Sequence, residues 1–154
     1  MPAKFTESEG AAWGQLLSVH AAMMRLLDTM LQTRHRISHG EFEVLLRLSW
    51  ASEGRMRLRD LADASVLTRS GMSRLVDRLE QAGLVGRETA AEDARGAYAV
   101  LTPAGRERLA VAERDNIALV QKCFLSLYSG EELAQMADFW RRFMASDQCA
   151  EEQN

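Results

Sequence analysis

Along the first fifth of the chain, apolar side chains recur every three or four residues, which is the period of an amphipathic helix. The stripe comprises Trp13, Leu16, Leu17, His20, Met23, Met24, Leu27, Met30 and Leu31. Thr6 and Glu9 stand three residues apart just before it, as in a capping box, where each side chain accepts the other residue's backbone N–H. The pattern predicts one long helix that starts after Thr6, ends at about Gln32 and buries this stripe.

A second capping box, Ser38 with Glu41, precedes a helix predicted over residues 39–50. Ile37 and Phe42 are placed to form a hydrophobic staple across its start, with the apolar face of the helix directed inward. Because an N-cap interrupts the chain here, the sequence predicts two separate helices rather than one continuous helix.

The next segment mixes short extended and helical patterns. Residues 56–58 form a strand candidate, and residues 60–64 a short helix. Thr68 is placed as the N-cap of a helix over residues 69–82. Gly83 fits the left-handed position that ends such a helix.

Two extended runs, residues 84–89 and 97–101, are separated by a polar loop and predict a hairpin. Thr102-Pro103 then places an N-cap before a proline, which favours a helix start, and the helix is predicted over residues 104–127. Ser129 and Glu132 form a third capping box before a last helix. Its apolar positions are Leu133, Met136, Trp140, Phe143 and Met144.

The order of elements predicts a mainly α fold with a small β-hairpin wing: a winged helix-turn-helix flanked by N- and C-terminal dimerisation helices. Two helices joined by about three residues and followed by a hairpin are typical of the winged helix-turn-helix. The expected domains are residues 1–36, a dimerisation helix, 37–102, the DNA-binding domain, and 103–154, further dimerisation helices. The terminal helices carry more apolar face than the middle can cover, which favours a homodimer.

The helix over residues 69–82 is expected to place one face in the core and one outward. Its buried face is predicted to hold Met72, Leu75, Val76 and Leu79. Its outward face is predicted to hold Arg69, Ser70, Ser73, Arg74 and Asp77, with Arg78 at the border. Arginine and hydroxyl groups bind phosphates, and arginine also reads guanine. Thr68, Ser70 and Gly71 lie where the helix dipole favours an anion.

The hairpin loop carries Arg95, and an arginine at a hairpin tip can enter a narrow minor groove. Asp93, two residues earlier, is placed to brace the guanidinium. The alternative is a solvated turn with an incidental charge pair.

Two segments carry a family resemblance: the wing pattern Asp93-x-Arg95-Gly96 followed by Val100-Leu101-Thr102-x-x-Gly105, and the segment Ser73-Arg74-Leu75-Val76-x-x-Leu79-Glu80-x-x-Gly83-Leu84-Val85. On these residues, the stretch 58–109 resembles the winged helix-turn-helix of the MarR family of bacterial transcription regulators. The resemblance implies a homodimer whose recognition helices enter successive major grooves of a double-stranded, pseudo-palindromic DNA operator. It places Arg95 at the minor groove, and Arg69, Ser70, Ser73 and Arg74 at the major groove and phosphates.

The resemblance further implies a small anionic or aromatic effector between the dimerisation helices and the winged domain. Trp13 and His20 share one helix face and could stack an aromatic ring and pair a carboxylate. Arg59 stands where a small N-cap residue is expected, and either lines this pocket or contacts the DNA backbone. The alternative is that Trp13 is a core residue and His20 an interface histidine.

Taken alone, the formal net charge of −3 argues against a nucleic-acid partner. The net charges of residues 1–54, 55–95, 96–130 and 131–154 are −1, +1, +1 and −4, so the acidity is concentrated at the C-terminal end. The distribution removes the objection, and it indicates modest nonspecific affinity for DNA.

Other chemistry finds little support in the sequence. His35 and His39 have a metal-ligand spacing, but Ser38 caps a new helix between them, so they are expected to be loop histidines without a metal. Cys123 lies on an apolar stripe as a core residue, and acidic neighbours of Cys149 disfavour a thiolate. No nucleophile elbow, phosphate-binding loop or metalloprotease motif occurs, so neither an enzyme nor a cofactor is expected.

The sequence therefore predicts a dimeric, sequence-specific DNA-binding regulator in the bacterial cytoplasm, a repressor relieved by a small effector. It shows no apolar run long enough for a membrane span and no signal peptide. One alternative is a winged-helix protein-interaction module without DNA binding. A second is an oxidation-sensing regulator that uses cysteine.

Overall fold

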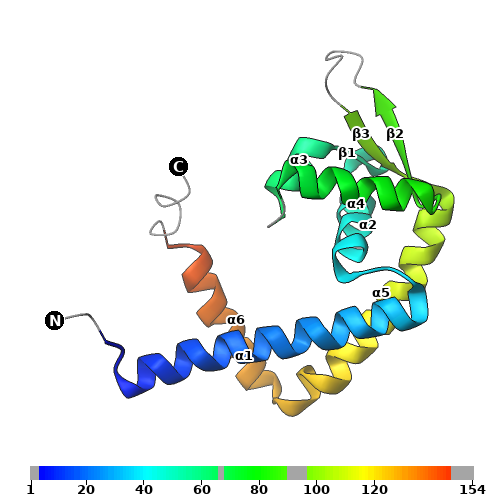
Figure 1. Ribbon diagram of the computed structural model, residues 1–154. Coiled ribbons are helices and arrows are strands. Elements are labelled where there is room, and N and C mark those ends of the chain that lie inside the picture. The colour runs from blue at the N-terminus through cyan, green and yellow to red at the C-terminus, as the bar shows by residue number, and fades with distance from the viewer. Residues whose placement is uncertain (1–3, 66–67, 90–96, 147–154) are drawn as a thin grey trace. The chain divides into compact units, whose positions relative to one another are not determined.

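The computed structural model of the chain describes residues 4–65, 68–89 and 97–146 (Figure 1). The chain divides into two compact units, residues 1–116 and residues 117–154. The fold is mainly helical with one small sheet, as predicted, and all the predicted helices are present.

Helix α1 spans Glu7–Met30 and begins with the predicted capping box. Thr6 N donates to Glu9 Oε2 at 2.7 Å, and Glu9 N donates to Thr6 Oγ1 at 3.3 Å. The end of α1 at Met30 lies close to the predicted end at about Gln32. The π-helical turn that follows, Leu31–His35, was not predicted, and it stops at Arg36 with a left-handed φ of 59°.

The stripe on α1 is buried only near its C-terminal end. Leu27 and Leu31 lie in the core, whereas Trp13 is 52% exposed and His20 is also exposed. The prediction of a fully buried stripe is therefore wrong for the single chain, because no other element among the described residues of this unit covers the N-terminal half of α1.

Helix α2, His39–Trp50, has the predicted bounds and the predicted capping box at Ser38 and Glu41. Its first N–H is also satisfied from outside the helix, since His39 N donates to Asp28 Oδ1 of α1 at 2.8 Å. This bond fixes the start of α2 against the end of α1.

Strand β1 spans Arg55–Arg57, and helix α3 spans Leu58–Asp63. Both begin earlier than predicted. Arg59 therefore lies inside the first turn of α3, and the cap position belongs to Arg57, whose side chain makes no capping hydrogen bond. The premise that Arg59 stands at the N-cap is wrong, because the helix starts at Leu58 in the turn that follows β1.

Helix α4 spans Arg69–Gln81, and Gly83 follows it with a φ of 72°, as predicted. Strands β2, Val85–Thr89, and β3, Ala97–Leu101, are antiparallel, with Val85 opposite Leu101. The sheet order is β1-β3-β2, so β1 adds a third strand to the predicted hairpin. The loop predicted at 90–96 lies outside the described residues.

The core of this unit lies between α2, α3, α4, the sheet and the start of α5. Its largest fully buried side chains are Leu31, Leu45, Leu48, Leu61, Met72, Leu79, Val44, Val76 and Val85. Gly105 of α5 packs so closely against the chain after α4 that a Cβ would lie 2.1 Å from Leu84 O. We call α2, α3, α4 and the three strands the winged unit. The start of α5 is therefore packed with the winged unit as one body.

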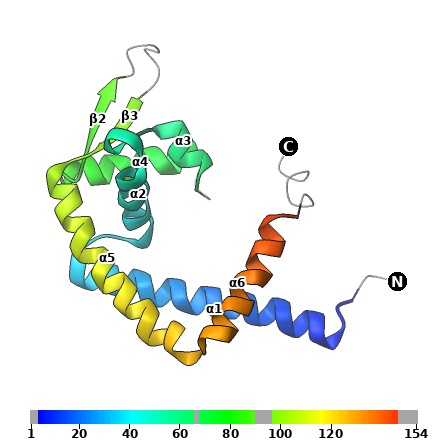
Figure 2. The same ribbon diagram turned by 180° about the vertical axis from the view of Figure 1, so that it is seen from behind.

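Helix α5 spans Pro103–Cys123 and reaches from the first unit into the second (Figure 2). The prediction that it continues to Leu127 is wrong, because Phe124 leaves the helical region at φ −129°, ψ −62° and a 3₁₀ turn, Leu125–Leu127, follows. Helix α6, Gly130–Met144, starts with the predicted capping box, and its apolar side chains Trp140, Phe143 and Met144 are exposed.

Candidate nucleic-acid interface

The N-terminus of α4 is set by Thr68. Its Oγ1 accepts the N–H of Gly71 at 3.2 Å and lies 3.2 Å from the hydroxyl of Ser70. The cap satisfies one of the free N–H groups of the first turn, and the two hydroxyls stand together where the helix dipole favours an anion. Both residues are exposed.

The two faces of α4 divide as the periodicity predicts. Met72, Leu75, Val76 and Leu79 are buried, which fixes the rotation of the helix about its axis. Arg69, Arg74 and Arg78 are exposed and Ser73 is half-buried. The structure thus brings all the sequence-predicted residues of α4 to the surface or its edge.

Two arginines of this face are available to a partner. Within the described part of the chain, the side chains of Arg69 and Arg74 form no hydrogen bond or ion pair. Arginines that no carboxylate neutralises keep their full attraction for a polyanion, and they can bind a phosphate or a guanine edge in bidentate geometry.

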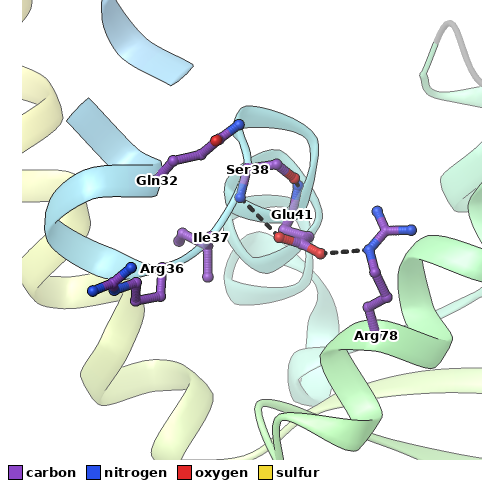
Figure 3. A pocket seen from close by; sticks show the side chains of 6 residues that line it. All are labelled: Gln32, Arg36, Ile37, Ser38, Glu41 and Arg78. Carbon is purple, nitrogen blue, oxygen red and sulfur yellow. Dashed lines mark hydrogen bonds and ion pairs between the residues drawn. The ribbon is translucent and has the colours of Figure 1, made fainter. Parts of the chain in front are cut away.

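Arg78 has a different environment, because it joins α4 to α2. Its Nε donates to Glu41 Oε1 at 2.9 Å, while Glu41 Oε2 accepts the N–H of Ser38 at 2.8 Å. Figure 3 shows the carboxylate of Glu41 between these two donors, with the guanidinium of Arg36 directed away from the pair. Glu41 and Arg78 line a groove of about 320 Å³, together with Arg36 and Ser38. Arg78 is thus a link between helices as well as a candidate DNA contact.

The charge state of Glu41 follows from these contacts. Burial raises the pKa of its carboxyl, but the hydrogen bonds from Ser38 and Arg78 outweigh burial, so the pKa lies below the ordinary glutamate value. Glu41 therefore remains ionised and keeps Arg78 paired.

Asp77, predicted on the outward face, is also paired. The Nη2 of Arg87 on β2 lies 2.5 Å from Asp77 Oδ1. Arg87 was not among the functional residues predicted from the sequence. The spacing of Asp77 and Glu80 on α4 places two acceptors on one face, but it does not identify the strand that carries their partner.

The wing is described only in part. Strands β2 and β3 form its two sides, while Asp93 and Arg95 lie outside the described residues. Their predicted roles at the minor groove stay predictions.

The candidate effector residues are dispersed. Trp13 and His20 lie exposed on α1, and Arg59 lies exposed on α3, where its Nε is 3.1 Å from Asp60 Oδ1. None of the three lines the groove at Glu41 and Arg78 or the cavities beside the start of α5.

The prediction of loop histidines is wrong, because the α1 end continues as a π turn. His35 lies in that turn and is buried, and its Nε2 is 3.0 Å from Asp115 Oδ2 of α5. This hydrogen bond lowers the pKa of the Asp115 carboxyl, with a smaller effect from Arg34. His39 is the first residue of α2. Residues 4–65, 68–89 and 97–146 contain no group of three potential metal ligands.

Cys123 is half-buried at the end of α5 rather than in the core, because the helix ends there. Cys149 lies outside the described residues. Across the described part of the chain, no helix has the length and hydropathy needed to span a bilayer.

Taken together, α2, α3, α4 and the three-stranded sheet form a winged helix-turn-helix. The exposed face of α4 carries two arginines, Arg69 and Arg74, that have no partner among the residues the structure describes, and they stand beside hydroxyl groups. In this class of protein, the second helix of the helix-turn-helix pair reads DNA in the major groove. The fold and the surface chemistry therefore define a DNA-binding class.

Comparison with known proteins identifies the family. The model of the MarR family matches residues 37–96. The structure of AbsC, a MarR family transcriptional regulator from Streptomyces coelicolor, is 31% identical; the match covers 92% of this chain and 95% of AbsC, with a TM-score of 0.84. Sco3205, a MarR family regulator from the same organism solved in complex with DNA, is 27% identical over 93% of this chain and 90% of its own, with a TM-score of 0.86. The chain belongs to the MarR family of transcriptional regulators, which are generally not enzymes.

BldR from Sulfolobus solfataricus shares the fold, with 23% identity, a TM-score of 0.74 and a match over 91% of this chain and 99% of its own. The comparison with curated proteins finds no match.

Proposed function

We propose that the chain is a homodimeric, sequence-specific DNA-binding transcription regulator of the bacterial cytoplasm. It represses its target genes until a small anionic or aromatic molecule binds. The observation that carries the proposal is the exposed face of α4, where Arg69 and Arg74 have no partner among the described residues and stand beside Ser70 and Ser73.

The chemistry of this face favours DNA over a protein partner. The core of a protein docking surface is enriched in aromatic side chains and methionine. The outward face of α4 instead offers guanidinium and hydroxyl groups, while its apolar residues are all buried. A DNA regulator therefore fits this face better than a protein-interaction module.

In the proposed complex, α4 lies in the major groove. Thr68 and Ser70 hold a phosphate at the helix N-terminus, and Arg69, Ser73 and Arg74 contact base edges and phosphates. Arg78 reaches the DNA backbone from the border of the face while its Nε stays on Glu41. The family relative Sco3205, whose structure contains DNA, supports this mode of action.

The wing supplies the second contact. We propose that Arg95 enters the minor groove next to the major-groove site, where the negative potential is enhanced. This proposal is supported by strands β2 and β3, which project away from α2 and α4 (Figure 1).

Dimerisation would cover the apolar faces that the single chain leaves exposed. On α1 these side chains are Trp13, Leu17 and Leu26, and on α6 they are Phe139, Trp140, Phe143 and Met144. Exposed faces of this extent are unusual for a monomer. In this proposal, residues 1–36 and 103–154 form the dimerisation region, and residues 37–102 bind one half-site of a pseudo-palindromic operator.

The effector site is proposed on Trp13, His20 and Arg59. An aromatic side chain and two cationic or hydrogen-bonding groups suit an aromatic acid. Trp13 and His20 lie on α1 and Arg59 lies on α3, so a ligand that contacted all three would act by changing the position of α3 and α4 relative to α1.

A mobility-shift titration tests the proposal directly. The titration compares the affinity of the protein for three kinds of DNA. These are duplexes that the wild-type protein selects from a random-sequence pool, the DNA that flanks its own gene, and a mixed-sequence duplex. We expect a discrete complex that forms only with the selected pseudo-palindromic duplexes and dissociates on addition of an aromatic acid such as benzoate. A folded dimer that selects no sequence would contradict the proposal and favour the docking module.

A further inference from the structure

One side chain, Arg87, joins the wing to the recognition helix. On β2, Arg87 stands opposite Ala99 of β3, and Ala99 is fully buried. Residues paired directly across two antiparallel strands share a face, so Arg87 lies on the side of the sheet that packs toward the helices. Arg87 itself is exposed at the edge of this side, where α4 provides acceptors for its guanidinium.

The guanidinium of Arg87 meets three acceptors on α4. Its Nη2 lies 2.5 Å from Asp77 Oδ1 and donates to Ser73 O at 3.2 Å. Its Nε lies 3.5 Å from Glu80 Oε2. The three acceptors are spaced at i, i+4 and i+7, so they lie on one face of α4 across two turns.

We propose that Arg87 is a positioning residue for DNA binding, which sets the direction of the wing relative to α4. The inference rests on the proposed function, because it concerns how two DNA-reading elements are held together. A guanidinium is planar with donors in fixed directions, so three acceptors along a helix restrain both the tilt and the slide of β2.

The same contact controls charge beside the reading face. Asp77 and Glu80 are carboxylates on the helix that approaches DNA phosphates, and Arg87 neutralises them. Without Arg87, the two carboxylates would repel the phosphate backbone, and β2 would lose this polar contact with α4. Both effects weaken DNA binding, although Arg87 itself touches no DNA.

Arg87→Met tests the proposal, with Arg55→Met as the matched control. Arg55 lies on β1, on the other side of β3 in the same sheet, and is similarly exposed, but its ion pairs are with Glu53 and Glu88, neither of which is on α4. Both variants lose one positive charge from the same sheet. Their affinities are measured for a duplex that the wild-type protein selects from a random pool.

We expect Arg87→Met to bind this duplex about fivefold more weakly than Arg55→Met, the effect of one to two exposed ion pairs. In a hydroxyl-radical footprint, it should lose the flanking protection due to the wing and keep the central protection due to α4. Equal affinities and footprints for the two variants would overturn the proposal. A wild-type protein that selects no duplex would instead contradict the proposed function.

A double-mutant cycle separates positioning from simple loss of charge. If Arg87 acts through Asp77, the effects of Arg87→Met and Asp77→Asn on affinity are strongly non-additive, whereas additive effects would refute the link. Thermal denaturation shows whether each variant is folded. If Arg87→Met is not, Arg87→Lys keeps the charge but cannot reach three acceptors, and it should show the same loss of flanking protection.

Discussion

Replacing Glu41 removes two interactions whose sizes can be estimated separately. Its carboxylate completes the capping box of α2 through Ser38 N at 2.8 Å, and loss of such a cap costs about 1 kcal/mol. It also accepts from Arg78 Nε at 2.9 Å; the Arg78 side chain is 57% exposed, so solvent screening leaves about 0.5 kcal/mol for this pair. Glu41→Ala should therefore lower the free energy of unfolding by about 1.5 kcal/mol, and Arg78→Ala by about 0.5 kcal/mol.

Urea denaturation of the two single variants and the double variant measures these values. The double-mutant cycle should give a coupling energy of about 0.5 kcal/mol between Glu41 and Arg78. Arg47→Ala is a suitable comparison, since Arg47 pairs with Glu43 within α2 and makes no link to α4. Additive effects of the Glu41 and Arg78 substitutions would refute the assignment of this pair as a link between α2 and α4.

The same pair has a defined pH dependence. Because the pKa of Glu41 is lower in the folded protein than in the unfolded chain, its stabilisation is fully present above the unfolded pKa and is lost as pH falls through the folded pKa. The difference in unfolding free energy between the wild type and Glu41→Gln should therefore shrink as pH is lowered from about 6 to about 3. A difference that does not change over this range would show that ionised Glu41 contributes nothing.

Three further substitutions test other parts of the account. Arg74→Ala should weaken binding to the selected duplex. It should also reduce the slope of log affinity against log salt by about 1.8 per dimer if Arg74 of each protomer neutralises one phosphate; an unchanged slope would mean base reading or no contact. Arg95→Ala should weaken specific binding by about 1–3 kcal/mol at matched salt, and unchanged affinity would remove its role at the minor groove. Gly105→Ala should lower stability by about 1–3 kcal/mol in thermal denaturation, since its Cβ would lie 2.1 Å from Leu84 O. A melting temperature equal to that of the wild type would show that α5 does not pack this closely.

Gly86→Ala serves as the control for the glycine substitution. A Cβ at Gly86 meets no heavy atom within 4 Å, and its backbone has no left-handed φ, so this variant should be as stable as the wild type. For the DNA measurements, Arg47→Ala removes one positive charge from α2 and should leave the salt slope unchanged.

The elements that local chemistry specifies were predictable from the sequence. The capping boxes at Thr6, Ser38 and Ser129 place three helix starts, and each forms with both of its hydrogen bonds. The two faces of α4 follow from its periodicity, because burial of four apolar side chains leaves only one rotation of the helix. The candidate DNA-binding face therefore needed no tertiary information.

The features that depend on distant residues were not predictable. The Glu41–Arg78 and Arg87–Asp77 contacts join elements that only the fold brings together. The distance along the sequence between the two residues of each pair does not identify them as partners. The π-helical turn after α1 is similarly fixed by contacts with α5, where His35 meets Asp115. The exposure of Trp13 was not predictable either, because amphipathic periodicity identifies an apolar face of a helix but not the element that covers this face.

The central claim is that α4 reads a specific DNA sequence. A fluorescence-anisotropy titration of the wild-type protein tests it most directly, with a selected pseudo-palindromic duplex and a mixed-sequence duplex of the same length at about 0.15 M salt. The account predicts that the selected duplex binds at least about 10³-fold more tightly. Equal affinity for the two duplexes, or no binding to either by a folded dimer, would contradict it.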